Sequence, residues 1–315
     1  MNELNHKCID WLLSSNHPSI RYLTKTNLLK EKPTEMDRHA LTVENSPIAQ
    51  IMHELKDGRY WVREQHFYSP KYMTSHWSLL LLHEYACPAE TPQIYEACEY
   101  LLELSYKHWL TGITEKNHCD HELSCFFGNV VRYGIAFGFA EHPYIQAMID
   151  YLSESKEGKE WCCIHNQNRA CLWGAIRSLY AFANLPERLY TAQVRESVQS
   201  ALQMVFNCAE MLTAETLSPS PKEHTLWGKL NFPLYYQADK LFTLRVLREH
   251  KQLQNEKLLP VLMWLQARRK SDGTWKGSNP YKSRSWPFAM DNENIHQWVS
   301  LQALTILVDA GLEKI

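Results

Sequence analysis

Glycine is scarce in this chain, at 11 of 315 residues, which is half the usual share of about 7%. Few positions can therefore adopt a positive φ angle without steric cost, so tight chain reversals are limited. No stretch shows sustained alternation of apolar and polar residues between hairpin-turn signals. These absences argue against a substantial β-sheet and favour a helical protein.

The chain also lacks a charge excess and a long hydrophobic run. Its 33 basic and 35 acidic residues give a formal charge of −2, too balanced for a protein that binds nucleic acid or an anionic membrane. The longest leucine run, residues 79–82, is far too short for a membrane span, and the N-terminus lacks a basic region followed by an apolar one. We therefore expect no nucleic-acid partner, no membrane span and a cytoplasmic location.

Aromatic residues and cysteines are plentiful. The sequence holds 11 Trp, 16 Tyr, 10 Phe and 9 Cys, and several segments place apolar residues at the three- and four-residue spacing of an amphipathic helix. An odd number of cysteines without a secretory signal argues against a disulfide scaffold. The composition predicts a helical protein with an aromatic interior, whose cysteines are reduced thiols or metal ligands.

An internal repeat organises the middle of the chain. Cys125 and Gly128 align with Cys171 and Gly174 at an offset of 46 residues, and the same offset relates Gly112 to Gly158 and Tyr144 to Tyr190. Fixed-period repeats of this length are typical of stacked supersecondary units.

Looser copies of the repeat predict helical hairpins. Inner helices are expected to begin near His76, Phe126, Leu172, Tyr236 and His296, and outer helices near Thr91, Pro143, Thr191 and Asn255. Several connecting loops join an Asp-Gly or Glu-Gly turn to a tryptophan, as in residues 57–61, 157–161 and 272–275. We expect residues 1–45 to form N-terminal capping helices of the same domain as the repeats in residues 46–315.

Three stretches resemble a known superfamily. The loop ending Ser271-Asp272-Gly273-Thr274-Trp275 resembles the QW-type repeat of terpenoid cyclases and of protein prenyltransferase β-subunits. Residues 232–239, and Trp286 followed by residues 297–304, are similar to bacterial prenyltransferase or squalene-oxidase repeat proteins. The resemblance covers most of residues 50–312. It implies an α/α toroid of five to six helical hairpins, with parallel inner helices around a central cavity.

Parallel inner helices would bring cysteine-bearing loops together at one rim, because the loops before two adjacent inner helices lie side by side. We expect Cys125, Cys163 and Cys171 as thiolate ligands of a zinc ion, with His165 or Asp120 as the fourth ligand. The alternative is that Cys125 and Cys171 recur because tight helix packing requires a small residue there.

Residues for catalysis are harder to identify. The DxDD motif, with which squalene cyclases protonate an alkene, is absent, and so is a DDxxD magnesium motif, so neither way of starting a cyclisation is expected. Asp239, one turn after Tyr236 on a predicted inner helix, is the only candidate for a lone cavity acid; alternatively, a neighbouring arginine or tyrosine hydroxyl satisfies its carboxylate. Arg132 and Arg177 could hold a diphosphate or a carboxylate, or they could pair with structural acids.

Three functions follow from these features. The first is a prenyltransferase-like or terpene-cyclase-like toroid that binds an apolar, isoprenoid-like ligand in a central aromatic cavity, with a zinc ion at the rim. This cavity would be lined by Tyr133, Trp173, Tyr180, Tyr236 and Trp298. The second is a zinc-dependent enzyme that activates thiols, since residues 161–163 are similar to a Trp-Cys stretch of lanthipeptide cyclases. The third is a non-catalytic toroidal scaffold for a protein partner.

Overall fold

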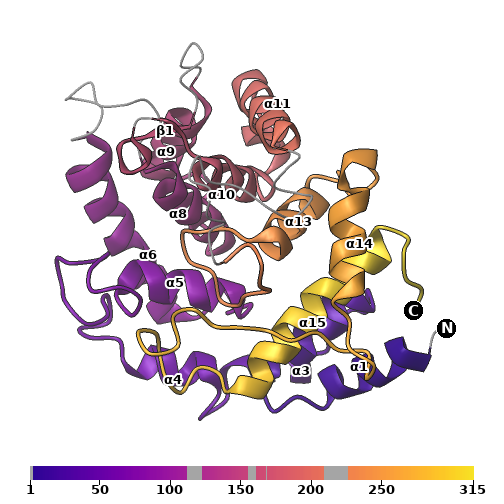
Figure 1. Ribbon diagram of the computed structural model, residues 1–315. Helices are drawn as coiled ribbons and strands as arrows, with labels where there is room; N and C mark the ends of the chain where they lie inside the picture. Colours follow the sequence, from indigo (N-terminus) through magenta and orange to yellow (C-terminus); the bar gives the residue numbers. More distant parts are fainter. Residues whose placement is uncertain (1–2, 112–122, 155–160, 168, 209–225) are drawn as a thin grey trace.

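A computed structural model describes residues 3–111, 123–154, 161–167, 169–208 and 226–315 of the protein (Figure 1). The described chain is mostly helical, which confirms the all-α prediction. Within these residues, no helix is both long and apolar enough to cross a lipid bilayer.

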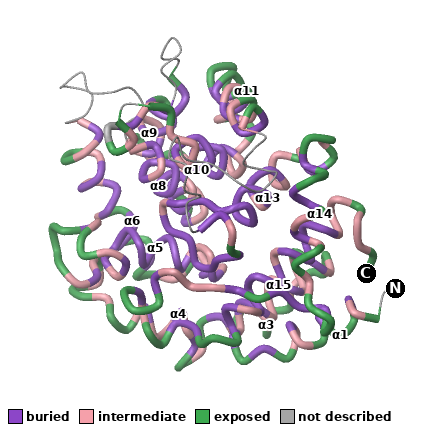
Figure 2. Tube along the Cα trace, viewed as in Figure 1, coloured by how far each residue is buried: buried purple, intermediate pink, exposed green. Residues whose placement is uncertain are grey.

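Five inner helices form the interior of the molecule and are largely buried (Figure 2). They are α5 (Ser75–Glu84), α8 (Ser124–Ala136), α10 (Leu172–Phe182), α13 (Lys240–Glu249) and α15 (Asn292–Asp309). All five begin within four residues of the predicted positions. Helix α13 begins four residues later than predicted, because the extended backbone at Asp239 ends the preceding loop and the Asp239 side chain accepts a hydrogen bond from Phe242 N at 2.7 Å.

The outer helices alternate with the inner ones in sequence, beginning with α4 before α5, and pack against them. They are α4 (Pro47–His53), α6 (Pro92–Ser105), α9 (Pro143–Ser153), α11 (Ala192–Asn207) and α14 (Leu259–Ala267). Proline at the first position begins α4, α6 and α9, where its missing N–H costs no helical hydrogen bond. Short π and 3₁₀ turns adjoin three of these helices: η2 (Tyr106–Leu110), η4 (Glu187–Leu189) and η5 (Glu256–Leu258).

The inner helices contact one another in chain order, from α5 through α8, α10 and α13 to α15. Side chains then connect α15 back to α5. The Trp298 ring stacks on that of Tyr85, which directly follows α5, with ring centroids 5.6 Å apart. Trp286 Nε1 also donates a hydrogen bond to Ser78 Oγ at 3.0 Å. The series of contacts is therefore cyclic.

Neighbouring inner helices run in the same direction. At the starts of α8 and α10, Ser124 lies beside Gly174, and near their ends Arg132 Nη1 donates to Tyr180 O at 3.0 Å. The ends of α13 and α15 are joined by an ion pair between Arg248 and Asp309. Glu84, at the end of α5, is hydrogen-bonded to Tyr180 and Arg245, so the later parts of the five inner helices lie near one end of the molecule.

Gly128 explains how closely α8 and α10 approach. A Cβ atom at this position would lie 2.5 Å from the backbone oxygen of Arg177, so any other residue would push the helices apart. Gly128, one of the repeated glycines, therefore allows α8 and α10 to pack closely.

Two Asp-Gly-Trp loops have the same local structure although they are far apart in sequence. The indole N–H of Trp61 donates to Ile51 O at 2.7 Å, and that of Trp275 donates to Leu265 O at 2.8 Å. Each ring therefore packs under the end of the preceding outer helix. Gly273 in the second loop has φ +87°, and a Cβ there would lie 2.5 Å from Leu4 O.

The N-terminal helices pack against the C-terminal part of the chain, and the two termini lie close together (Figure 1). These helices are α1 (Glu3–Leu13), α2 (Pro18–Leu23), the π-helical turn η1 (Thr24–Leu28) and α3 (Glu35–Thr42). Asn5 Nδ2 donates to Lys314 O at 2.8 Å, and Ser15 Oγ donates to Gln297 Oε1 at 2.6 Å.

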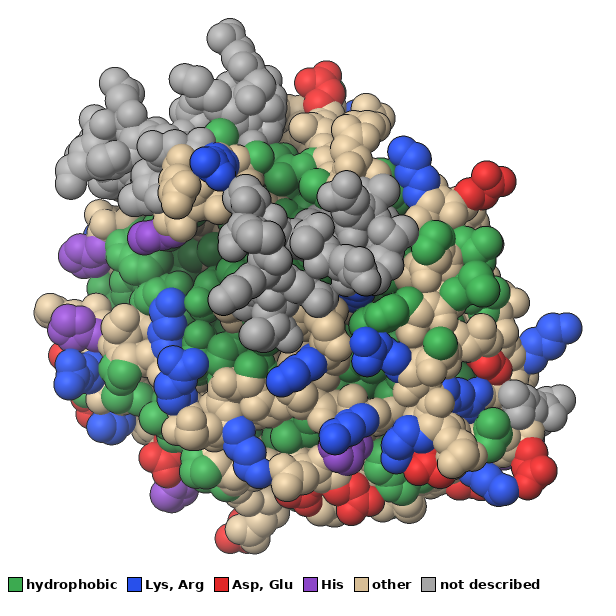
Figure 3. All heavy atoms as spheres, in the orientation of Figure 1, with side chains coloured by type: hydrophobic (Ala, Val, Ile, Leu, Met, Phe, Trp, Pro, Cys, Tyr) green, Lys and Arg blue, Asp and Glu red, His purple; other side chains and the backbone are tan. Residues whose placement is uncertain are grey.

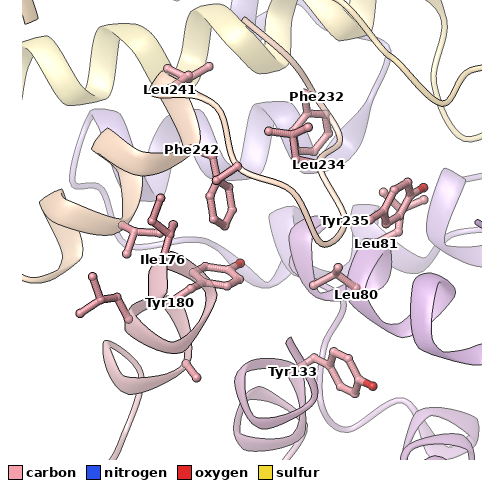
Figure 4. Close-up of a cluster of buried hydrophobic side chains, with 14 of the residues drawn as sticks. Leu80, Leu81, Tyr133, Ile176, Tyr180, Phe232, Leu234, Tyr235, Leu241 and Phe242 are labelled. Atoms are coloured by element: carbon pink, nitrogen blue, oxygen red, sulfur yellow. The ribbon is translucent and has the colours of Figure 1, made fainter. Parts of the chain in front are cut away.

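The loop before α13 fills space between the inner helices. Figure 4 shows Phe232, Leu234 and Tyr235 of this loop among side chains of α5, α8, α10 and α13. Asn129 Nδ2 donates to Tyr235 O at 2.7 Å and so anchors the loop to α8. The middle of the helical assembly is therefore packed with side chains.

Candidate functional site

Three of the predicted zinc ligands come together where α8 and α10 begin. Cys125 is the second residue of α8, Cys171 immediately precedes α10, and Cys163 lies in a short antiparallel hairpin. The hairpin strands are β1 (Cys162–Cys163) and β2 (Arg169–Ala170), with the 3₁₀ turn η3 (Ile164–Asn166) between them. The thiols of Cys163 and Cys171 are hydrogen-bonded to each other.

The three thiols differ in acidity because their surroundings differ. The hydrogen bond from Cys171, together with the backbone N–H groups of His165 and Leu123, lowers the pKa of Cys163 to about 6. The same thiol–thiol bond raises the pKa of Cys171 well above its usual value. Burial, followed by the charge of Cys163, raises the pKa of Cys125 to about 11. Cys163 is therefore the most acidic of the three thiols.

The remaining zinc ligands do not join the cluster in the described structure. The His165 side chain is exposed, and Asp120 lies outside the described residues. Among the residues that are described, no three His, Cys, Asp or Glu side chains are arranged to hold a metal ion. Zinc therefore stays a prediction, and zinc far below one ion per chain after purification without chelators would exclude it.

Asp239 is held as a structural group. It is fully buried, and its carboxylate accepts hydrogen bonds from Phe242 N and from both the backbone and side-chain nitrogens of Asn231, at 2.7–2.9 Å. Burial raises its pKa to about 6. With its oxygens occupied and no exposed surface, Asp239 has no open path along which to protonate a ligand. Asp239 is therefore a structural carboxylate, as in the alternative prediction, but its partners are amide nitrogens and not an arginine or a tyrosine.

The two predicted anion-binding arginines are engaged by the protein itself. Arg177 is fully buried and donates to Asn129 Oδ1 at 3.2 Å, and to two carbonyl oxygens of the loop before α13 at 3.0 and 2.5 Å. Arg132 pairs with Glu249 through two nitrogens, at 2.6 and 3.2 Å. Neither guanidinium is placed to receive a diphosphate without losing these bonds.

We call the group Glu84, Arg132, Tyr180, Arg245 and Glu249 the charged end, because it lies where the inner helices finish. Arg245 binds both carboxylate oxygens of Glu84, at 2.7 and 2.6 Å, and Tyr180 Oη donates to Glu84 at 2.7 Å. Burial would raise the pKa of Glu84, but the Arg245 charge and hydrogen bonds lower it to about 2. These side chains border a cavity of about 320 Å³, which Trp298 also lines.

We call the group Tyr68, Lys71, Tyr72, Trp77 and Tyr236 the aromatic end, because it lies where the inner helices begin. The Lys71 Nζ atom lies 4.4 Å from the ring centroid of Tyr236, 4.9 Å from that of Tyr68 and 6.0 Å from that of Trp77. Tyr72 stacks on Tyr235 with centroids 4.7 Å apart. Figure 3 shows hydrophobic side chains in a recess beside Lys and Arg side chains on one face.

The cations at the aromatic end have no acidic partner among the described residues. Lys71 is half-buried, and Arg284, which is exposed, lies over the Tyr72 ring at 5.3 Å. Burial lowers the pKa of Lys71, nearby Cys125 opposes this shift, and the Arg284 charge adds to it. Neither residue forms an ion pair with a carboxylate in the described part of the chain. These two positively charged groups therefore lie beside aromatic rings and remain able to bind an anion.

Of the five predicted cavity-lining aromatics, two remain partly exposed. These are Trp173 and Tyr236, whose rings meet edge-to-face at 6.1 Å between centroids. Tyr133, Tyr180 and Trp298 are buried, and Tyr180 and Trp298 also line the cavity at the charged end. Tyr133 Oη lies 3.1 Å from His76 Nδ1.

Sequence reasoning missed Lys71 and Arg284. A signal was present, since residues 65–83 and 273–290 contain no Asp or Glu but several aromatic and basic residues. A basic residue in such a segment has no local carboxylate to pair with. The two segments are about 200 residues apart, so only the fold could show that they meet.

No protein-family model, curated protein or solved structure matches the chain.

Proposed function

We propose that the protein is an α/α toroid of the terpenoid-cyclase and protein-prenyltransferase type that binds an isoprenoid-like ligand with an anionic headgroup at the aromatic end. The cyclic contacts among five parallel inner helices support the toroid, as do the two equivalent Asp-Gly-Trp loops. The resemblance in residues 232–239, 266–275 and 297–304 is consistent with it.

Lys71 is the observation that carries the ligand proposal. Its ammonium group is partly withdrawn from water and lies over three aromatic rings, yet no described carboxylate neutralises it. A half-buried charge without a counter-charge is costly, and an anionic ligand would relieve that cost. Arg284 adds a second positive group on the same side, which suits a headgroup with more than one negative charge.

The rings beside Lys71 suit the apolar part of such a ligand. Tyr68, Trp173 and Tyr236 are each only partly buried, so their faces can still contact a bound hydrocarbon chain. Binding sites of this kind combine apolar and aromatic walls with a few polar groups that fix orientation. Because the loop before α13 occupies the middle of the assembly, we assign the ligand to the aromatic end and not to a deep central cavity.

Equilibrium binding of farnesyl diphosphate to the purified full chain tests the proposal. We expect farnesyl diphosphate to bind more tightly than farnesol, which lacks the charge, and than inorganic diphosphate, which lacks the tail. Lys71→Met should weaken binding by about tenfold or more, because a charge-assisted interaction is lost. Tyr236→Ala should weaken binding of farnesol as well as of the diphosphate.

Lys257→Met is the matched control, because Lys257 is an exposed lysine in η5 outside the aromatic end. It should bind farnesyl diphosphate like the unaltered protein. Circular dichroism should show the same helix content in every variant. Equal affinity of the Lys71→Met variant and the unaltered protein would refute the proposed headgroup site, and no binding of any of the three ligands would refute the function.

A further inference from the structure

The β1–β2 hairpin sets Cys163 and Cys171 on the same side of the chain. Cys163 pairs with Arg169 in the hairpin, and Cys171 follows Arg169 by two residues. Side chains two residues apart on a strand point to the same face. The backbone pairing continues beyond β2, since Cys171 N donates to Trp161 O at 2.8 Å. The register therefore makes Cys163 and Cys171 diagonal neighbours on one face of the hairpin.

We propose that Cys163 and Cys171 form a redox-active dithiol, which a small disulfide such as glutathione disulfide converts into an intramolecular disulfide. The two residues are diagonal neighbours on one face of the hairpin, so a local rearrangement of their side chains can join the sulfur atoms. Cys171 is partly exposed, which gives a small oxidant access to the pair. This proposal is independent of whether an isoprenoid binds at the aromatic end.

The other cysteines of the described chain are less suited to this chemistry. Cys8 and Cys98 have no exposed surface, so an oxidant cannot reach them without unfolding. Cys162 is adjacent to Cys163 but lies on the opposite face of the hairpin, because side chains alternate along a strand. Cys125 lies in α8, outside the hairpin, although Cys163 is near enough for its charge to raise the pKa of Cys125.

The reaction proceeds by two thiol–disulfide exchanges. One thiolate of the pair attacks a sulfur of glutathione disulfide, which forms a mixed disulfide and releases one glutathione thiolate. The second thiol of the pair, after losing its proton to solvent, attacks the protein sulfur of the mixed disulfide and displaces the second glutathione. The protein loses two protons and two electrons, and glutathione disulfide takes up both to become two glutathione molecules.

Peptide mapping of the full chain tests the pair directly. The protein is reduced, dialysed against EDTA so that no metal masks the thiols, exposed to glutathione disulfide and then alkylated. Trypsin cleaves after Lys159, Arg169 and Arg177, so the expected disulfide links peptide 160–169 to peptide 170–177. The linked peptides should carry no alkyl group on Cys163 or Cys171, and dithiothreitol should separate them.

Single substitutions distinguish the two neighbouring cysteines. Cys163→Ser and Cys171→Ser should each abolish the link between the two peptides, whereas Cys162→Ser, the matched control, should retain it. Cys163→Ala provides a second test if the serine variant does not fold, as judged by circular dichroism. A link that survives Cys163→Ser would overturn the assignment. Folded wild-type protein that forms no link, or that stops at the glutathione mixed disulfide, would overturn it too.

Discussion

The two ends of the helical assembly differ in whether their positive charges are neutralised by carboxylates. At the charged end, Arg245 and Arg132 are each held by two hydrogen bonds to a carboxylate, Glu84 and Glu249 respectively. At the aromatic end, Lys71 has aromatic rings around it and no carboxylate among the described residues. A paired, buried charge is committed to the fold, whereas an unpaired one remains available to a ligand. The difference therefore separates a structural network from a candidate binding site.

Removing an acid at the charged end should have the largest effect on stability. Glu84→Ala leaves Arg245 largely buried without its counter-charge, which we expect to lower the free energy of unfolding by about 3–5 kcal/mol. Urea denaturation measures the change. Glu64→Ala is the control, because Glu64 pairs with Arg59 at 2.7 Å on the surface, and its loss should cost less than about 1 kcal/mol. Equal costs at the two sites would show that the charged end is not a buried network.

Adding a methyl group at Gly128, within α8, should have the next largest effect on stability. Gly128→Ala places a Cβ against the Arg177 backbone where α8 and α10 meet, and we expect a loss of about 1–3 kcal/mol. Gly138→Ala meets no atom within 4 Å but carries a φ of +93°, so its cost of about 1 kcal/mol is purely conformational. Thermal and urea unfolding compare the two variants. A smaller loss for Gly128→Ala would contradict the close helix contact.

Asp239, a buried acid that no arginine neutralises directly, should make the stability of the protein depend on pH. Its pKa is raised from 3.8 to about 6, so the folded protein holds a proton that the unfolded chain has released between these values. The contribution of Asp239 to stability is thus complete below about pH 4 and declines as the pH rises towards 6. The free energy of unfolding, measured from pH 4 to pH 7 for the unaltered protein and for Asp239→Asn, should diverge across this window. Parallel curves would argue against the raised pKa.

The smallest effect on stability should come from Lys71→Met. No described carboxylate loses a partner, and the apolar side chain keeps its contact with the rings, so we expect a change within about 0.5 kcal/mol. Urea denaturation under the conditions used for Glu84→Ala makes the comparison direct. A loss of several kcal/mol would mean that Lys71 belongs to a structural network like that of the charged end.

Much of the helical framework could be predicted, because it depends on local patterns. The helices around Phe126 and Leu172 follow from apolar periodicity, and Gly128 and Gly174 recur where α8 and α10 approach. The start of α13 was predicted four residues too early because Tyr235 and Tyr236 have helical spacing to later apolar residues. Their backbone is instead held in a loop, to which Asn129 and Arg177 donate from other helices.

The candidate site was only partly predictable. The repeat indicated that Cys125, Cys163 and Cys171 meet, and these thiols do lie together. Arg132 and Arg177 stood out by position in the sequence, but their carboxylate and carbonyl partners come from distant segments that no spacing rule connects. Lys71 was not predicted as a site residue. What distinguishes it is that no described carboxylate pairs with it, and a linear sequence does not show which charges are paired.

By itself, the sequence determined the helical class, the approximate positions of the hairpins and the clustering of thiols, because periodicity and repeat spacing act over a few turns of chain. Only the tertiary structure decided which charges are satisfied. Whether Asp239 is a cap, Arg177 a support for a loop or Lys71 an unpaired cation depends on groups from other segments and on their exclusion of water. Electrostatic energies in a folded protein depend on distance in space and on burial, and neither can be read from separation along the chain.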